Sequence, residues 1–446
     1  MVASKRQARL MSRIRTEEMV TKLAELVATE SVVEDGHTEF GVVERVAAWC
    51  QEDGLMFDVW EVAPGRPNLE IVWQGSEAGP TLLFEAHSDT VTAGDLSHWT
   101  RPPFQLTQEG DRLYGRGTAD TKGNLVAAYV GLRELGRMTE GQFPGTCRLL
   151  VPIDEEGMMT GIREYIASGR ARNVNAAICC EPEDAQVCVR QKGALRIRVE
   201  ILGKMAHGAM PLTGNNPLSV AAQFIESMTE EEAYQQDQVG FDPYLGWPSV
   251  TPTEIHSPLS GVGAFNVVPD AVAISLDIRT VAGQSHDDLK ARIQSRLDSV
   301  IRDANQSLHE GRVKRLREAL EKPIQTGSYR ASMQLLDDRP ATETPVDSVV
   351  VQSMGSAIEE RLAAPAIFSG VPGATDGTWL WQAGIPIVTT GAGNRFVPHQ
   401  VDEWVSLEQL RDVAVIYADA ALRFLTSTPA STPASRPDGG DEDNDI

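Results

Sequence analysis

Short apolar runs alternate with helical repeats along the first part of the chain. The strand-like runs are 67–73, 81–87, 146–154 and 175–182. Between them, residues 121–136 and 160–169 repeat their apolar positions at helical spacing. Strands that alternate with helices form βαβ units, so we expect a largely parallel sheet covered by helices from about Glu17 to Glu181.

A different pattern follows Cys188. The expected elements are a strand at 193–203, a helix at 217–231, strands at 248–255 and 270–280, and a helix at 285–306. With a further strand near 312–323, the order becomes β-α-β-β-α-β, which is ferredoxin-like.

The α/β pattern returns after about Thr326, with a helix at 344–362, a strand at 385–390 and a helix at 406–425. The second domain is therefore inserted into the first. We expect domain limits of 1–190 and 326–426 for the two parts of the first domain and 191–325 for the inserted domain. The segment 427–446 is rich in Ser, Pro, Gly and acidic residues and is expected to be disordered.

Composition restricts the class of protein. A length of 446 residues allows two or three domains, and the five cysteines lack CxxC spacing, which favours buried thiols in a reducing compartment. There is no apolar run of the ~20 residues that span a bilayer, so we expect a cytoplasmic protein. The basic opening segment could imitate an organelle presequence, but an amphipathic helix at 16–30 follows at once and favours the fold instead.

The charge balance argues against two kinds of partner. Lys and Arg number 40 and Asp and Glu 63, which gives a net charge of −23. Such a charge repels phosphate backbones and anionic lipid, so we expect neither nucleic acid nor membrane as a partner.

Candidate metal ligands stand at the ends of three strand-like runs. One run leads into His87 and Asp89, the next into Glu155 and Glu156, and the third into Glu181. In open α/β sheets the carboxyl ends of strands form the ligand site, so these side chains can converge. Taken alone, the first pair would more often be a hydrogen-bonded polar pair, and the adjacent glutamates could be a solvated acidic loop.

Two glycine-rich loops add further candidates. Asp120 stands in GRGTADTKG before a helix, where a simple N-cap is the alternative, and His399 stands in GAGNRFVPHQVDEW. Glu155 and Glu156 are adjacent on an extended segment and point in different directions, so one can bind metal while the other acts as a general base. Histidines and carboxylates without thiolate suit zinc, with cobalt or manganese as alternatives.

With these residues the sequence resembles the co-catalytic metallopeptidases that include aminoacylase, acetylornithine deacetylase, succinyl-diaminopimelate desuccinylase and the bacterial glutamate carboxypeptidase. The motifs occur in the family's order between about Glu17 and Leu425: HSDTV, GRGTADTKG, DEEG, CEP, GKMAHGAMP, FNVVPD, DIRT and PHQVDE. The resemblance implies a zinc-exopeptidase-like three-layer catalytic domain with an inserted ferredoxin-like lid that also serves for dimerisation.

The resemblance implies a role for each matching residue. Asp120 would bridge two metal ions, His87 and Glu181 would complete one site, and Glu156 and His399 would complete the other. Glu155 would be the general base. Asp89 would stand behind the metal-bound histidine, and Lys122 and Gly123 complete the Asp-x-Lys-Gly signature.

Three residues of the lid match further positions of the family. His207 would polarise the scissile carbonyl, and Asn266 and Arg279 would contact the substrate, where an arginine suits a free carboxylate. Without the family, a capping asparagine and a surface arginine would be preferred. The remaining histidines match no ligand position: His37, His98, His256, His286 and His309.

The resemblance predicts a homodimeric hydrolase that cleaves the amide bond of a small N-acyl amino acid or short peptide. Glu181 slightly favours the deacylase and desuccinylase branch. TWLW in the loop around Asp376 departs from the family branches with known substrates, so the specificity for the acyl group and for the side chain stays open. No GxSxG elbow and no complete nucleotide-binding loop occurs. Two alternatives stay open: hydrolysis of a ureido, amidine or aryl amine C–N bond, and a non-catalytic binding relative.

Overall fold

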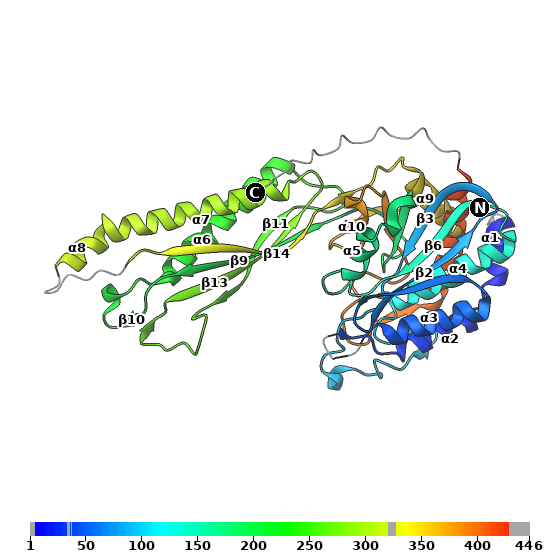
Figure 1. The fold of residues 1–446 in the computed structure, drawn as a ribbon, viewed down its shortest axis with the longest axis horizontal. Helices are drawn as coiled ribbons and strands as arrows, with labels where there is room; N and C mark the ends of the chain where they lie inside the picture. Colours follow the sequence, from blue (N-terminus) through cyan, green and yellow to red (C-terminus); the bar gives the residue numbers. More distant parts are fainter. Residues whose placement is uncertain (1–4, 34–35, 37, 320–326, 428–446) are drawn as a thin grey trace.

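The computed structural model describes residues 5–33, 36, 38–319 and 327–427, and they form two lobes (Figure 1). The larger lobe contains both ends of the described chain. The chain leaves it after β8 (Val187–Gln191) and returns at β15 (Thr342–Glu343). The predicted α/β domain with an inserted α+β domain is therefore confirmed.

The larger lobe is built on a nine-stranded sheet with the order β1-β2-β6-β3-β7-β17-β8-β15, and β16 also pairs with β8. Its other strands are β1 (Met56–Ala63), β2 (Arg66–Gln74), β3 (Glu77–Glu85), β6 (Pro144–Val151), β7 (Ala176–Cys180), β16 (Phe368–Val371) and β17 (Ile387–Thr390). The four strands from β6 to β17 are parallel. Their carboxyl ends lie at one edge of the sheet, where ligand sites form in α/β folds.

The sheet is more mixed than the sequence predicts. β1 and β2 are joined by only Pro64 and Gly65, and so short a connection forces an antiparallel hairpin. β2 is also antiparallel to β6, and β8 is antiparallel to both β17 and β15. The parallel arrangement is thus limited to the centre of the sheet and to the pairing of β16 with β8.

Helices cover both faces of the sheet. Alternate side chains of β3 show the division, because Leu82 and Phe84 pack into one core whereas Leu83 packs into another. The first core includes residues from α1 (Lys5–Arg13), α2 (Thr16–Val27), α3 (Phe40–Asp53), α4 (Lys122–Thr139), α9 (Val349–Leu362) and α11 (Leu407–Thr426). The second includes α5 (Thr160–Ala167) and α10 (Gly377–Gln382). The predicted three-layer domain is the result.

The described part of the basic opening segment, from Lys5 onward, belongs to this fold. In α1, the Gln7 amide donates to the Asp419 carboxylate at 2.7 Å and to the Ala357 carbonyl at 3.0 Å. Leu10 is fully buried in the main core. The amphipathic pattern of α1 therefore reflects its packing against α9 and α11.

The lid contains a four-stranded antiparallel sheet with the order β11-β13-β9-β14. Its strands are β9 (Gly193–Leu202), β11 (Ser249–His256), β13 (Ala271–Thr280) and β14 (Arg330–Arg339). α6 (Pro217–Val239) and α7 (His286–His309) pack on it around a separate apolar core. This arrangement is the predicted ferredoxin-like fold.

The last lid strand lies later than predicted. Residues 312–318 of the expected strand form α8 (Arg312–Glu318) instead, because Val313 and Arg317 pack toward α7 and the lid while the charged residues between them face solvent. Residues 320–326 lie outside the described part of the chain. Since β14 ends at Arg339, we propose that the inserted domain extends to about 340.

Smaller elements complete the structure. β4 (Thr107–Glu109), β5 (Arg112–Tyr114) and β18 (Trp404–Ser406) form a three-stranded sheet, and β10 (Ala206–His207) pairs with β12 (Val267–Val268). All five cysteines are buried and free. Within the described ranges, no helix combines the length and apolarity needed to cross a membrane. Residues 428–446 of the expected tail lie outside those ranges.

Candidate metal centre

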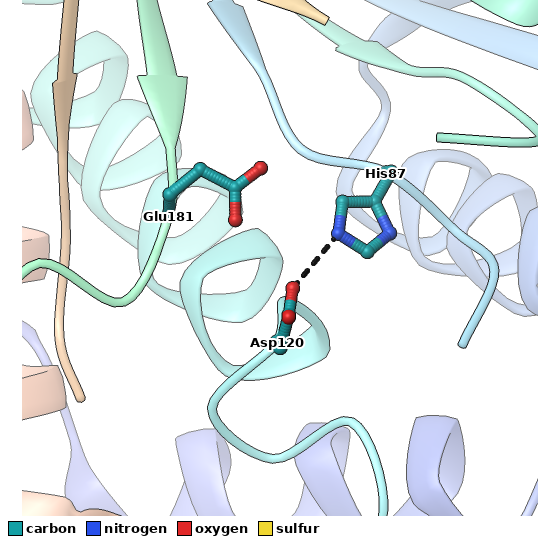
Figure 2. Close-up of side chains that lie close together, drawn as sticks. All are labelled: His87, Asp120 and Glu181. Carbon is teal, nitrogen blue, oxygen red and sulfur yellow. Dashed lines mark hydrogen bonds and ion pairs between the residues drawn. The ribbon is translucent and has the colours of Figure 1, made fainter. Parts of the chain in front are cut away.

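The strand ends bring the predicted ligands together. His87 follows β3, Glu156 follows β6, and Glu181 follows β7, which are neighbouring parallel strands. Asp120 reaches the same place from the loop before α4, and Figure 2 shows its carboxylate pointing at the His87 ring beside Glu181. Convergence of groups so far apart in sequence follows directly from the parallel centre of the sheet.

The five predicted ligands form two overlapping clusters. The ligand atoms of His87, Asp120 and Glu181 lie within 4.8 Å of one another, and so do those of Asp120, Glu156 and His399. Asp120 is shared, since Oδ1 lies 3.0 Å from His87 Nε2 and Oδ2 lies 3.3 Å from His399 Nε2. One carboxylate therefore offers a different oxygen to each cluster.

The helix after Asp120 does not use it as a cap. The N-cap residue of α4 is Thr121, and no side-chain hydrogen bond caps the helix there. The simple N-cap interpretation is therefore wrong, and the Asp120 side chain is directed at the two histidines instead.

Asp89 organises the loops around the first cluster. His87 Nδ1 lies 3.1 Å from the Asp89 carbonyl oxygen and 3.5 Å from its Oδ1, which leaves Nε2 facing Asp120. The Asp89 carboxylate also accepts the backbone N–H groups of Glu155 at 3.1 Å and Glu156 at 3.0 Å. One side chain thus fixes both an imidazole and the loop with the two glutamates.

The Asp120 loop rests on a buried ion pair that the motif analysis missed. The Glu403 carboxylate accepts the backbone N–H groups of Ala119 at 2.9 Å and Asp120 at 3.1 Å. Arg116 binds its other oxygen at 2.6 Å, and both side chains are buried. Arg116 belongs to the motif GRGTADTKG and Glu403 to the motif PHQVDE. Their membership of these motifs is the feature of the sequence from which a role at this site could have been predicted.

Lys122 of the same signature also has a structural role here. Its buried Nζ donates to the carbonyl oxygens of Leu26 at 3.0 Å and Thr29 at 2.9 Å. Burial lowers the pKa of this ammonium to about 7. The lysine therefore ties the start of α4 to the end of α2.

The two glutamates after β6 have different surroundings. Glu156 Oε1 lies 3.0 Å from His399 Nε2 and belongs to the second cluster, whereas Glu155 belongs to neither cluster. Burial and the charges of Glu156 and Asp120 raise the pKa of Glu155 well above its usual value, against the opposing effect of His87. These different surroundings fit Glu156 as a metal ligand and Glu155 as a free proton acceptor.

The main electrostatic feature of the two clusters is an excess of negative charge from their carboxylates. Burial, followed by the charge of Asp120, raises the pKa of Glu181 well above its usual value. Hydrogen bonds to Asp120 and Glu156 raise the pKa of His399 to about 10. In the metal-free protein, protons thus offset carboxylates that a cation would otherwise neutralise. The oxygen and nitrogen donors, without thiolate, fit zinc, cobalt or manganese.

A cavity of about 200 Å³ opens beside these groups. Glu155, Glu156 and Glu181 contribute to its wall, together with Val371, Pro372 and Thr375. Asp376 of the same loop is fully buried and does not line the cavity. The loop therefore faces the site through the residues that precede Asp376.

The structure does not bring the predicted lid residues to the metal ligands. His207 lies on β10, which Figure 1 shows near the end of the lid farthest from the larger lobe. Its neighbour Gly208 donates to the Asn266 carbonyl at 2.6 Å, so His207 and Asn266 are close to each other. Arg279 is engaged by both oxygens of Asp277, at 2.6 and 3.0 Å.

The other histidines lie outside both clusters. His286 bridges Thr280 and Asp338 in the lid, and His309 contacts Ser328. His98 is near Asp95, and His256 ends β11. His37 lies outside the described residues.

Comparison with known proteins agrees with this picture. The sequence profile of peptidase family M20/M25/M40 matches residues 83–423. A probable succinyl-diaminopimelate desuccinylase of Staphylococcus aureus is 26% identical over 437 residues, which cover 93% of this chain and 99% of the relative.

Two solved structures share the fold. Human carnosine dipeptidase 1 has a TM-score of 0.70 at 15% identity and covers 95% of this chain and 100% of its own. A Bacillus subtilis protein described as a dinuclear metal binding peptidase of the M20 family has a TM-score of 0.65 at 16% identity, with coverage of 92% and 98%.

Proposed function

The chain belongs to peptidase family M20/M25/M40, and from this premise we propose that it is a metal-dependent hydrolase of the amide bond in a small N-acyl amino acid or short peptide. The observation that carries the proposal is the sharing of Asp120 between two histidine–carboxylate clusters with Glu155 buried beside them. This arrangement matches what hydrolysis by two metal ions requires.

We assign His87, Asp120 and Glu181 to one divalent ion and Asp120, Glu156 and His399 to the other. Zinc is the metal that this donor set favours, and cobalt and manganese suit it too. When bound, such ions polarise a carbonyl oxygen and lower the pKa of water from ~16 toward ~7.

Glu155 is assigned the proton transfers. It is buried, lines the cavity and is free of both ligand clusters. Its carboxylate takes a proton from the attacking water and then gives it to the leaving nitrogen. Asp89 keeps this glutamate in place through the backbone N–H, and it also orients His87.

The lid is assigned substrate binding. His207 would polarise the scissile carbonyl, while Asn266 and Arg279 would contact a substrate that carries a carboxylate. Arg279 now pairs with Asp277, so a substrate carboxylate would have to replace or share that partner. Because β10 is remote from the metal ligands, these contacts need lid closure or a second subunit.

A homodimer formed through the lid would provide the second subunit. β11 is one of the two edge strands of the lid sheet, and most of its side chains are exposed. An exposed edge strand is a natural place for pairing with another copy. We propose such a dimer, with a small-molecule substrate and neither nucleic acid nor membrane as partner.

The substrate is best identified by a hydrolysis screen of the zinc-loaded protein. The panel should contain N-acetyl and N-succinyl amino acids, dipeptides, and ureido, amidine and aryl amine compounds. We expect turnover of an amide that carries a free carboxylate, with loss of activity in Asp120→Asn. Exclusive turnover of a non-amide C–N bond would replace the amide assignment, and no turnover at all with metal bound would favour a binding protein.

A further inference from the structure

Two neighbouring segments connect the lid with the larger lobe. In the large sheet, Thr342 of β15 pairs with Gln191 of β8, and in the lid sheet Arg339 of β14 pairs with Ala194 of β9. The two chain crossings therefore run side by side as a short ribbon. Any movement of the lid has to bend or twist this ribbon.

The lid end of the ribbon is closely packed against the rest of the lid. A Cβ atom at Gly193 would lie 2.2 Å from Thr280 Oγ1 and 2.6 Å from the Ala341 nitrogen, so only glycine fits there. His286 bridges the Thr280 hydroxyl at 2.7 Å and the Asp338 carboxylate at 2.6 Å. Because the backbone next to Arg339 is held by these lid contacts, we expect it to move with the lid.

The Arg339 side chain points from the lid back to the larger lobe. Its Nη2 donates to the Gly157 carbonyl oxygen at 2.7 Å, while its Nε lies 2.9 Å from Asp337 Oδ2. The side chain is only 9% exposed, so the contact is shielded from water. Gly157 directly follows Glu156, and the lid thus has a direct contact with the loop that carries both glutamates.

The remaining supports of that loop come from the larger lobe. Asp89 accepts the backbone N–H groups of Glu155 and Glu156. At the other end, the Asp154 carboxylate accepts the Thr160 hydroxyl at 2.8 Å and lies 3.0 Å from Arg66. The loop is therefore held by its own lobe and, through Gly157, by the lid.

We propose that Arg339 is a positioning residue that couples the lid to the loop bearing Glu155 and Glu156. Rotation of the lid carries the guanidinium with β14 and shifts the Gly157 carbonyl, which changes the placement of the adjacent glutamates. The inference rests on the proposed function, because that function gives these glutamates their roles.

The direct test is hydrogen–deuterium exchange of the zinc-loaded protein without substrate. In Arg339→Met, exchange of the Glu155 and Glu156 amides should rise by roughly tenfold, because opening of the loop loses one anchor. The control is Arg198→Met on β9, whose guanidinium pairs with Glu200 inside the lid at 3.1 Å. It should leave these two amides unchanged.

A second variant separates coupling from general damage to the fold. Arg339→Lys keeps a charged donor but lacks the fork that reaches both Asp337 and Gly157. Its loop exchange should be intermediate between that of wild type and Arg339→Met, at an unchanged melting temperature. Wild-type exchange of the loop in both variants would overturn the proposal, and so would equal acceleration in Arg198→Met.

Kinetics then test whether the coupling acts through the glutamates. Misplacement of a reacting group can cost up to about 100-fold in rate, and we expect Arg339→Met to lower kcat by roughly tenfold with KM little changed. In the Glu155→Gln background the same substitution should have no further effect. If the effects of Arg339→Met and Glu155→Gln on kcat are fully additive, Arg339 does not act through Glu155. If the wild type hydrolyses nothing, the proposed function fails, while the exchange experiment still decides the coupling.

Discussion

Asp89 Oδ1 accepts the backbone N–H of Glu155 at 3.1 Å, so a residue after β3 fixes a residue after β6. The same carboxylate orients His87, so Asp89 connects the first cluster of candidate metal ligands with the expected base. The centre is thus held by side chains that need not touch either metal.

Replacement of Asp89 by asparagine should therefore lower activity without unfolding the protein. The amide has one acceptor oxygen where the carboxylate has two, so it cannot accept both N–H groups and also face His87. Loss of such support typically costs ~10–100-fold in metal affinity or activity. Steady-state kinetics and zinc content would measure the effect.

The matched control is Asp95→Asn, an exposed carboxylate that caps a short helical turn. It should match wild type in both measurements. Wild-type activity and zinc content in Asp89→Asn would contradict the supporting role.

Glu403→Gln should destabilise the protein and weaken metal binding together. The substitution breaks a buried pair with Arg116 and disturbs the support of the Asp120 backbone. Breaking a buried ion pair typically costs ~3–5 kcal/mol of unfolding free energy. Urea denaturation of the metal-free variant would measure this loss.

An exposed pair provides the comparison for Glu403. Glu109 binds Arg101 at the surface, and Glu109→Gln should leave the urea midpoint unchanged because water already screens that pair. Equal midpoints for the Glu403 variant and wild type would show that the buried pair does not stabilise the loop.

Metal binding should release protons. Hydrogen bonds to Asp120 and Glu156 raise the pKa of His399 to about 10, so the metal-free imidazole is protonated at neutral pH. A ligand must be neutral, and the affinity of this cluster should therefore rise with pH until the pH passes that pKa. Calorimetry in buffers of different ionisation enthalpy counts the protons, and His399→Gln should release about one fewer than wild type.

A proton count that is the same in wild type and His399→Gln would mean that His399 does not bind metal. The measurement is independent of any substrate. It therefore tests the ligand set even before the natural reaction is identified.

His207 should complete the active site of a second subunit. His207→Ala and Glu155→Gln are each expected to be inactive, but their mixed dimer would contain one intact composite site. Random exchange makes half of the dimers mixed, so activity should recover to about a quarter of the wild-type value. Verified mixed dimers without recovery would exclude the cross-subunit role, and a fully active His207→Ala would exclude any catalytic role.

The sequence predicts the convergence of three candidate ligands because they stand at the ends of parallel strands. His87, Glu156 and Glu181 follow β3, β6 and β7, and the pairing of these strands determines their convergence. Asp120 and His399 stand in loops, where the resemblance to a family was needed to assign them.

Other features depend on tertiary contacts between residues that are far apart in the sequence. Glu403 supports Asp120 from a position 283 residues away, and Arg339 reaches Gly157 across two domains. The sequence predicts the last lid strand too early, because residues 312–318 form a helix. The packing of this helix against α7 is not evident from the local sequence pattern. The antiparallel pairing of β1 with β2 likewise follows from the two-residue turn before β2.

We propose that Glu155 transfers protons beside a pair of metal ions that it does not bind. The most direct test of this proposal is the measurement of metal content and kcat on the same preparation of Glu155→Gln. General acid–base catalysis typically contributes ~10²–10⁴-fold, so kcat should fall by that factor while both metal ions stay bound. A near-normal kcat, or the loss of a metal ion, would contradict the division of roles between Glu155 and Glu156.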